Sequence, residues 1–240
     1  MLSCPCSEQK PITTSKTLLE YVSTGQPSEP QVHAAFLDIR PTYGDYMKAM
    51  QHVHKGNAVR EARKSDAAGF TFDAFNPGNH TLDIYTINTS KEVRMGMKMF
   101  PHYLRTVEEM GGEPKALKPQ HVPSCQFHWR LSLGVFNPEP GYMQGDVVVD
   151  RRLLSYANLV RTGNIIWYAV FIGHGDYLDL GIMYKMHFGA YKWLKQAGKQ
   201  WAAGAEYLVY AYMNNDSLSA WKRRVMFHAG LMVYKDGAMV

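Results

Sequence analysis

The feature that most constrains the fold of this chain is a pair of apolar runs joined by a short polar turn. The runs Leu153 to Val160 and Asn164 to Ile172 flank the tetrapeptide Arg161-Thr-Gly-Asn164. Apolar stretches of this length, separated by a turn that contains glycine, are typical of a β-hairpin. We therefore expect two neighbouring antiparallel strands over these residues.

The residues after the hairpin follow turn, helix and strand patterns in succession. The turn Gly173-His-Gly-Asp176 comes directly after the second strand. Apolar residues then recur every three or four positions, which predicts an amphipathic helix. These residues are Ile182, Met186, Ala190, Trp193 and Ala197. The runs Glu206 to Met213 and Leu231 to Tyr234 predict strands, and Asn214 to Ser217 offers N-cap residues for a helix between them.

Before residue 126 the patterns are largely helical. Residues 1–16 are rich in Ser, Thr and Pro, which predicts a flexible tail. The apolar run Val32 to Ile39 predicts a strand. Tyr46, Met50 and Val53 follow at spacings of four and three, which predicts a helix.

A basic segment and a capping pattern complete the N-terminal part. Residues 52–64 are rich in His, Lys and Arg, a pattern that fits either a solvated surface or contact with an anion. Thr89 followed by Glu92 fits a capping box, so we expect a helix that begins at Thr89 and runs through Arg94 and Met97.

Composition narrows the class of protein. The net charge of +5 favours anionic partners, although no long basic run is present and solvated charge explains it equally well. Cys4, Cys6 and Cys125 cannot form a disulfide framework, and no Cys/His spacing suggests a metal site. The longest apolar run, Ile165 to Ile172, is too short to span a bilayer, and no signal peptide is recognisable. We therefore expect a cytoplasmic protein without a membrane partner.

The order of these elements resembles the conserved half of the GNAT superfamily of N-acetyltransferases and its Fem-type relatives. The residues that carry the resemblance are Leu153–Ile172, Gly173–Gly181, Ile182–Gln196, Glu206–Met213 and Leu218–Phe227. The resemblance implies an α/β fold in which helices flank a mixed, mostly antiparallel twisted sheet. No mid-chain linker is long enough to be a domain boundary, so we expect one domain over residues 1–240. The resemblance implies that its conserved core lies in 126–240 and its acceptor side in 17–125.

The resemblance implies an activity as well, the transfer of an acyl group from a thioester donor to the amino group of a small molecule. In such enzymes two central strands part, and freed backbone N–H groups hold the donor while a helix N-terminus holds its phosphate. The parting is expected between Ile165–Ile172 and Tyr207–Met213. The implied donor-binding residues are Ile172, Gly173, Gly175, Gly181, Asn214 and Lys222. No permanently bound cofactor is expected, because the acyl carrier is a co-substrate.

The glycine turn departs from the pyrophosphate loop of coenzyme A users, Q/R-x-x-G-x-G/A. His174, Asp176 and Asp179 stand there instead, and acidic side chains repel a diphosphate. Three donors therefore stay open: acyl-CoA, an acyl-carrier protein, and aminoacyl-tRNA, which Fem-type relatives use. In the last case residues 52–64 would bind phosphates. A non-catalytic ligand- or protein-binding module of the same fold is the remaining alternative.

Candidate catalytic residues lie at the ends of the two strands that are expected to part. His174 and Asp176 stand between glycines, where either would act as acid or base or would simply cap the following helix. Tyr210 and Tyr212 share a strand face, and one of them, Tyr212 in the first instance, is a candidate proton donor to the leaving group, unless both only pack in the core. His187 is expected to be a half-buried structural histidine.

Candidate substrate-binding residues crowd the predicted capping box. They are Asn88, Ser90, Lys91 and Arg94. Lys91 and Arg94 are one helical turn apart and would clamp a carboxylate or a phosphate, unless they are ordinary surface charges.

Overall fold

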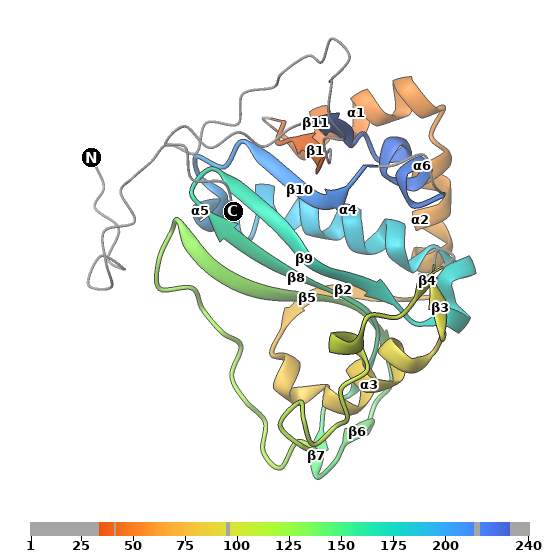
Figure 1. Ribbon diagram of the computed structural model, residues 1–240, viewed down its shortest axis with the longest axis vertical. Helices are drawn as coiled ribbons and strands as arrows, with labels where there is room; N and C mark the ends of the chain where they lie inside the picture. Colours follow the sequence, from red (N-terminus) through yellow and green to blue (C-terminus); the bar gives the residue numbers. More distant parts are fainter. Residues whose placement is uncertain (1–33, 41, 95–96, 214–216, 231–240) are drawn as a thin grey trace.

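The computed structural model describes residues 34–230 apart from 41, 95–96 and 214–216. A seven-stranded sheet, in the order β11-β1-β10-β9-β8-β5-β2, forms its centre (Figure 1). The four central strands are β5 (His128–Pro138), β8 (Arg151–Thr162), β9 (Ile165–Gly173) and β10 (Tyr207–Tyr212). The β9–β10 pair is parallel and the other pairs of this sheet are antiparallel. This mixed sheet, flanked by helices, confirms the predicted fold class.

The segment before residue 126 supplies strands to both flanks of the sheet. These strands are β1 (Ala34–Asp38) and β2 (Thr71–Phe75). β1 lies between β10 and β11 (His228–Gly230), whereas β2 pairs with β5 at the opposite edge. The sheet is therefore not built by residues 126–240 alone.

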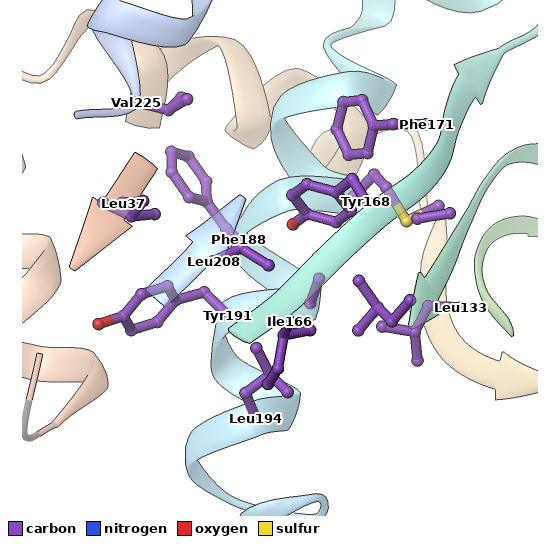
Figure 2. Close-up of a cluster of buried hydrophobic side chains, with 14 of the residues drawn as sticks. Leu37, Leu133, Ile166, Tyr168, Phe171, Phe188, Tyr191, Leu194, Leu208 and Val225 are labelled. Atoms are coloured by element: carbon purple, nitrogen blue, oxygen red, sulfur yellow. The ribbon is translucent and has the colours of Figure 1, made fainter. Parts of the chain in front are cut away.

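One face of the sheet is covered by a layer of helices, which Figure 1 shows on the upper side. Its members are α1 (Tyr43–His54), α2 (Asn57–Ala67), α4 (Ile182–Lys195), α5 (Lys199–Ala202) and α6 (Ser217–Arg224). The predicted stripe residues Ile182, Met186 and Ala190 are fully buried, as the periodicity requires. Figure 2 shows the core they share, with Phe188, Tyr191 and Leu194 of α4 against the strands. The helix ends at Lys195, however, and Ala197 is exposed.

The other face carries α3 (Thr81–Thr89), whose Ile84 and Ile87 pack against Leu153 and Ile172. The prediction of a helix that begins at Thr89 is therefore wrong, because the helix ends there. Its apolar residues lie before Thr89, and the Thr89 hydroxyl donates to the Tyr85 carbonyl instead of capping a new helix.

Short elements connect these layers. After α3 come the hairpin strands β3 (Val93–Arg94) and β4 (Met97–Lys98), then η2 (Pro101–Tyr103). The others are η1 (Pro77–Asn79), β6 (Met143–Gln144), β7 (Val147–Val148) and η3 (Gly175–Leu180). No helix within the described ranges is long and apolar enough to cross a membrane. The predicted tail 1–16 and the predicted strand Leu231–Tyr234 lie outside the described residues.

Candidate active site

Strands β9 and β10 pair over half of their length and then part. Their register joins Tyr207 to Ile165, and it ends at Val209 and Trp167. Both strands continue, β9 to Gly173 and β10 to Tyr212, without further pairing to each other. The sequence therefore predicted the parting correctly, and we call the space between the unpaired ends the β9–β10 opening.

Aromatic rings fill the opening. Phe171 of β9 lies 5.2 Å from the ring of Tyr210 and 5.4 Å from that of Trp221, measured between ring centres. Tyr168 also contacts Tyr210, at 5.7 Å. In Figure 2 the rings of Tyr168 and Phe171 project from the same strand toward α4. The opening is thus lined by side chains from β9, β10 and α6.

Two polar groups of the opening could act on a ligand. The Trp221 Nε1 is buried and has no hydrogen-bond partner among the described residues, although the whole side chain is partly exposed. The Tyr210 hydroxyl lies 3.5 Å from the Phe171 carbonyl oxygen, and burial raises the pKa of Tyr210 well above its ordinary value. The side chains around the opening therefore include a buried N–H without a partner among the described residues and a hydroxyl that keeps its proton. Nothing in the residue pattern indicated that the Trp221 N–H would have no partner among the described residues.

His187 lies beneath the opening and is fully buried, so the prediction of a half-buried residue is wrong. The Tyr46 hydroxyl donates to the Val225 carbonyl at 3.0 Å, so it accepts from the His187 Nε2, 2.9 Å away. The Nδ1 must then accept from the Tyr168 hydroxyl at 3.2 Å. Burial lowers the pKa of His187 to about 3, so the ring is neutral. Its role is structural, because both ring nitrogens are occupied.

The loop after β9 holds the two acid–base candidates close together. The His174 Nδ1 accepts from the Asp176 backbone N–H at 3.2 Å, and the Asp176 carboxylate lies 3.9 Å away. Partial burial is the main cause that lowers the pKa of His174. The neutral ring therefore presents its Nε2–H, whereas the carboxylate of Asp176, with its side chain 82% exposed, is the available proton acceptor.

The structure brings three predicted acceptor-side residues, Ser90, Lys91 and Arg94, to this loop. The Arg94 guanidinium donates to the Gly173 carbonyl at 2.9 Å and to the Ser90 hydroxyl oxygen at 2.9 Å. The same oxygen accepts from the Gly175 N–H at 2.9 Å. A Cβ at Gly175 would stand 2.8 Å from the Lys91 Cγ, so Lys91 lies over the loop. Ser90 and Arg94 thus shape the end of β9, and the predicted clamp on a ligand stays a prediction.

Two other predicted residues are buried. Asn88 is 3% exposed, and its side-chain oxygen accepts from the Tyr156 hydroxyl at 2.8 Å. Lys222 is 1% exposed, and its Nζ lies 4.4 Å from the centre of the Tyr210 ring. Lys222 therefore adjoins the opening, and its predicted contact with a donor stays a prediction, whereas Asn88 lies on the buried face of α3 with its acceptor occupied.

The remaining donor-side residues surround the start of α4. Gly181 has a φ of 73°, and a Cβ there would stand 1.9 Å from the Glu61 carbonyl oxygen. The backbone of α2 therefore crowds the first turn of α4, where a phosphate was expected. A Cβ at Gly173 would stand 2.6 Å from the Met183 Sδ, and Ile172 is buried in the α3-side core. The Tyr212 side chain and Asn214 lie outside the described residues.

Comparison with known proteins shows a similarity in fold to solved structures. Neither a protein-family model nor a curated protein matches this chain. The crystal structure of FemX aligns with 89% of this chain and 63% of its own, with a TM-score of 0.55 and 9% identity. At this identity the likeness shows the fold alone, and this chain spans less than two thirds of FemX.

A second solved structure is the C-terminal domain (DUF2156) of a putative lysylphosphatidylglycerol synthetase from Agrobacterium fabrum. It covers 83% of this chain and 58% of its own, at 11% identity and a TM-score of 0.44, which is too low to establish a common fold. Within the described part of the chain, no three His, Cys, Asp or Glu side chains gather as a metal ion would require.

Proposed function

We propose that this protein is a transferase that moves an aminoacyl group from an aminoacyl-tRNA to the amino group of a small molecule. The observation that carries the proposal is the buried Trp221 Nε1 beside the β9–β10 opening, which has no partner among the described residues, in a fold like that of FemX. The Fem-type resemblance of the element order implies the same donor. The enzyme would form an amide bond.

Two features favour tRNA over coenzyme A as the carrier. The backbone of α2 crowds Gly181, at the place where a coenzyme A diphosphate would meet the helix N-terminus. The exposed Asp176 adds a negative charge to the same loop. A tRNA needs no pocket for a diphosphate, and the exposed Lys91, which lies over the loop at Gly175, suits its phosphates.

Residues of the opening and of the loop after β9 would divide the chemistry among them. The acceptor's ammonium gives a proton to the Asp176 carboxylate, and the free amine attacks the ester carbonyl carbon. The Trp221 N–H stabilises the negative charge that develops on the carbonyl oxygen. The ester C–O bond then breaks, the Tyr210 hydroxyl protonates the departing ribose oxygen, and the attacking nitrogen gives its second proton to the Tyr210 oxygen, which leaves a neutral amide, a free ribose hydroxyl and a protonated Asp176. The raised pKa of Tyr210 keeps that proton available until this step.

A second candidate is a non-catalytic module that binds a ligand or a partner protein. The observation in its favour is the ring packing of Tyr168, Phe171 and Tyr210, which occupies the space where a donor would lie. Under this alternative the protein binds its partner elsewhere and turns over no donor.

A transfer assay with a donor panel tests both candidates. The panel holds radiolabelled aminoacyl-tRNA, acetyl-CoA, longer acyl-CoA and an acylated carrier protein, each with a pool of small amines. We expect amide product from aminoacyl-tRNA alone, at a rate that falls steeply with added salt. Product from acyl-CoA would show that the acyl donor is a thioester rather than an aminoacyl-tRNA. Absence of product from every donor would favour the non-catalytic module.

The variant Trp221→Phe tests the role of the indole N–H. It keeps an aromatic ring but removes the donor, so we expect transfer to slow by roughly 100-fold, the typical loss for one oxyanion donor. Trp193→Phe on α4 is the matched control, because Trp193 lies outside the opening. Equal rates for Trp221→Phe and the unaltered protein would remove Trp221 from the mechanism.

A further inference from the structure

A cleft of about 500 Å³ opens in the helical layer, between α1, α2, α4 and the edge strand β2. Its floor is apolar and is made by Met47, Val59, Phe72, Phe188 and Trp193. A smaller hollow of about 360 Å³ adjoins it and shares Val59 and Arg63 with it. The lining of the cleft includes none of the residues that border the β9–β10 opening.

The floor depends on a glycine of α4. A Cβ at Gly189 would stand 2.3 Å from the Phe72 ring, so the ring of Phe72 lies directly against the helix backbone. Any larger residue at position 189 would push that ring into the cleft. The apolar floor of the cleft therefore depends on the close approach of β2 to α4 at Gly189.

The charges around the cleft are unbalanced. Its two acids are already paired, Asp66 with Lys185 and Asp73 with Arg151. Arg63 of α2 and Lys192 of α4 line the same cleft, and neither has an acidic partner among the described residues. Both side chains are exposed and stand on neighbouring helices. The cleft thus combines an apolar floor with two uncompensated cations at its rim.

We propose that this cleft binds a small amphiphile with one phosphate headgroup and an apolar body. The apolar body would lie on Phe72 and Phe188, and the phosphate would lie between Arg63 and Lys192. Two cations on separate helices match a dianionic headgroup better than one cation would. The volume falls in the range of small-ligand sites, about 300–1,000 Å³. This site does not depend on the transferase activity proposed above.

Calorimetry on the full chain with three matched probes tests the proposal. The probes are octyl phosphate, octanol and inorganic phosphate, which carry both features, the apolar body alone and the anion alone. We expect octyl phosphate to bind at least about tenfold more tightly than either of the others. The double variant Arg63→Gln/Lys192→Gln should weaken octyl phosphate by about tenfold or more. Lys64→Gln is the control, since Lys64 is on α2 outside the cleft and pairs with Glu61.

Several outcomes would overturn this assignment. Octyl phosphate could fail to bind, or it could bind the double variant as tightly as the unaltered protein. Equal affinity for inorganic phosphate and octyl phosphate would show that the floor contributes nothing. A short RNA that displaces octyl phosphate, and that depends on the same two cations, would assign them to nucleic acid instead. The melting temperature of each variant is measured alongside, because both substituted side chains are exposed and the fold should not change.

Discussion

The paired and the parted halves of β9 and β10 differ in what holds them. From Ile165 to Trp167, β9 shares backbone hydrogen bonds with β10, and Ile166 and Leu208 are fully buried beneath the helical layer. Beyond Trp167 no backbone bonds join the two strands. There the rings of Phe171 and Tyr210 make the contact instead.

This difference means that only side chains join the parted half of β9 to β10, although the same half keeps its backbone pairing with β8. Tyr168, its first residue, is fixed by a hydrogen bond to the buried His187, and its last residue, Gly173, is held by Arg94. Backbone pairing tolerates many side chains, whereas such contacts tolerate few. The seam between the two parted ends has side-chain contacts and no backbone pairing of its own, so it is also where a ligand can enter at modest cost.

The largest effect is expected from His187→Ala. The substitution leaves a cavity and removes the acceptor of the buried Tyr168 hydroxyl, so the free energy of unfolding should fall by about 4 kcal/mol. Chemical denaturation measures it, and His187→Phe, which keeps a ring, separates the cavity from the lost hydrogen bonds. A loss below about 1 kcal/mol would mean that the parted half is held by something else.

Leu208→Ala tests the paired half in the same way. Leu208 is fully buried in β10. The lost apolar burial and the cavity left by the substitution should lower the free energy of unfolding by about 3 kcal/mol. The loss should be smaller than that of His187→Ala, because no polar group is left without a partner and the backbone ladder remains. The reverse order of the two losses would break the comparison between the halves.

Acid pH should destabilise the protein through His187. Burial lowers the pKa of His187 to about 3 in the folded state, against 6.5 for an ordinary histidine, so protons bind first to the unfolded chain. Stability from this residue is therefore complete above pH 6.5 and decreases as the pH falls. The expected loss at pH 5 is about 2 kcal/mol. Denaturation from pH 8 to 5 measures it, and His187→Phe should lack this component of the slope.

The smallest effect on stability is expected from Trp221→Phe. Its Nε1 has no partner among the described residues, so removing the N–H should change the free energy of unfolding by less than about 1 kcal/mol. Thermal denaturation is sufficient to check this. A larger loss would identify the N–H as part of the fold, and it would weaken the case for a ligand contact at the opening.

Local residue patterns were sufficient to predict the β8–β9 hairpin turn and the start of α4. The hairpin turn falls where predicted, with Gly163 at a φ of 61°, and α4 begins at Ile182 because its apolar periodicity begins there. The capping box at Thr89 is also a local pattern, and the helix start that it predicted is wrong. Its residue types are right for a helix start, but the Ser90 hydroxyl donates to the Ile87 carbonyl and ends the preceding helix instead.

The candidate site depends on contacts that no local pattern encodes. The parting of β9 and β10 followed from the resemblance of the element order, not from periodicity. Arg94 meets Gly173 across 79 positions of sequence, and Tyr46 meets His187 across 141. Neither pairing leaves a trace in spacing or composition, so the anchors of the opening required the structure.

The position of β1 has a consequence for how the chain is made. Its residues Ala34 to Leu37 are buried between β10 and β11, yet roughly 170 residues separate Asp38 from its partner Tyr207. At about 5–20 residues per second, a ribosome needs about 10–30 s to deliver that partner. During this time the apolar segment of β1 is outside the ribosome, and neither of its edges is paired. The sheet is completed late in synthesis, and a chaperone that shelters β1 should raise the yield of folded protein more than one that acts after release.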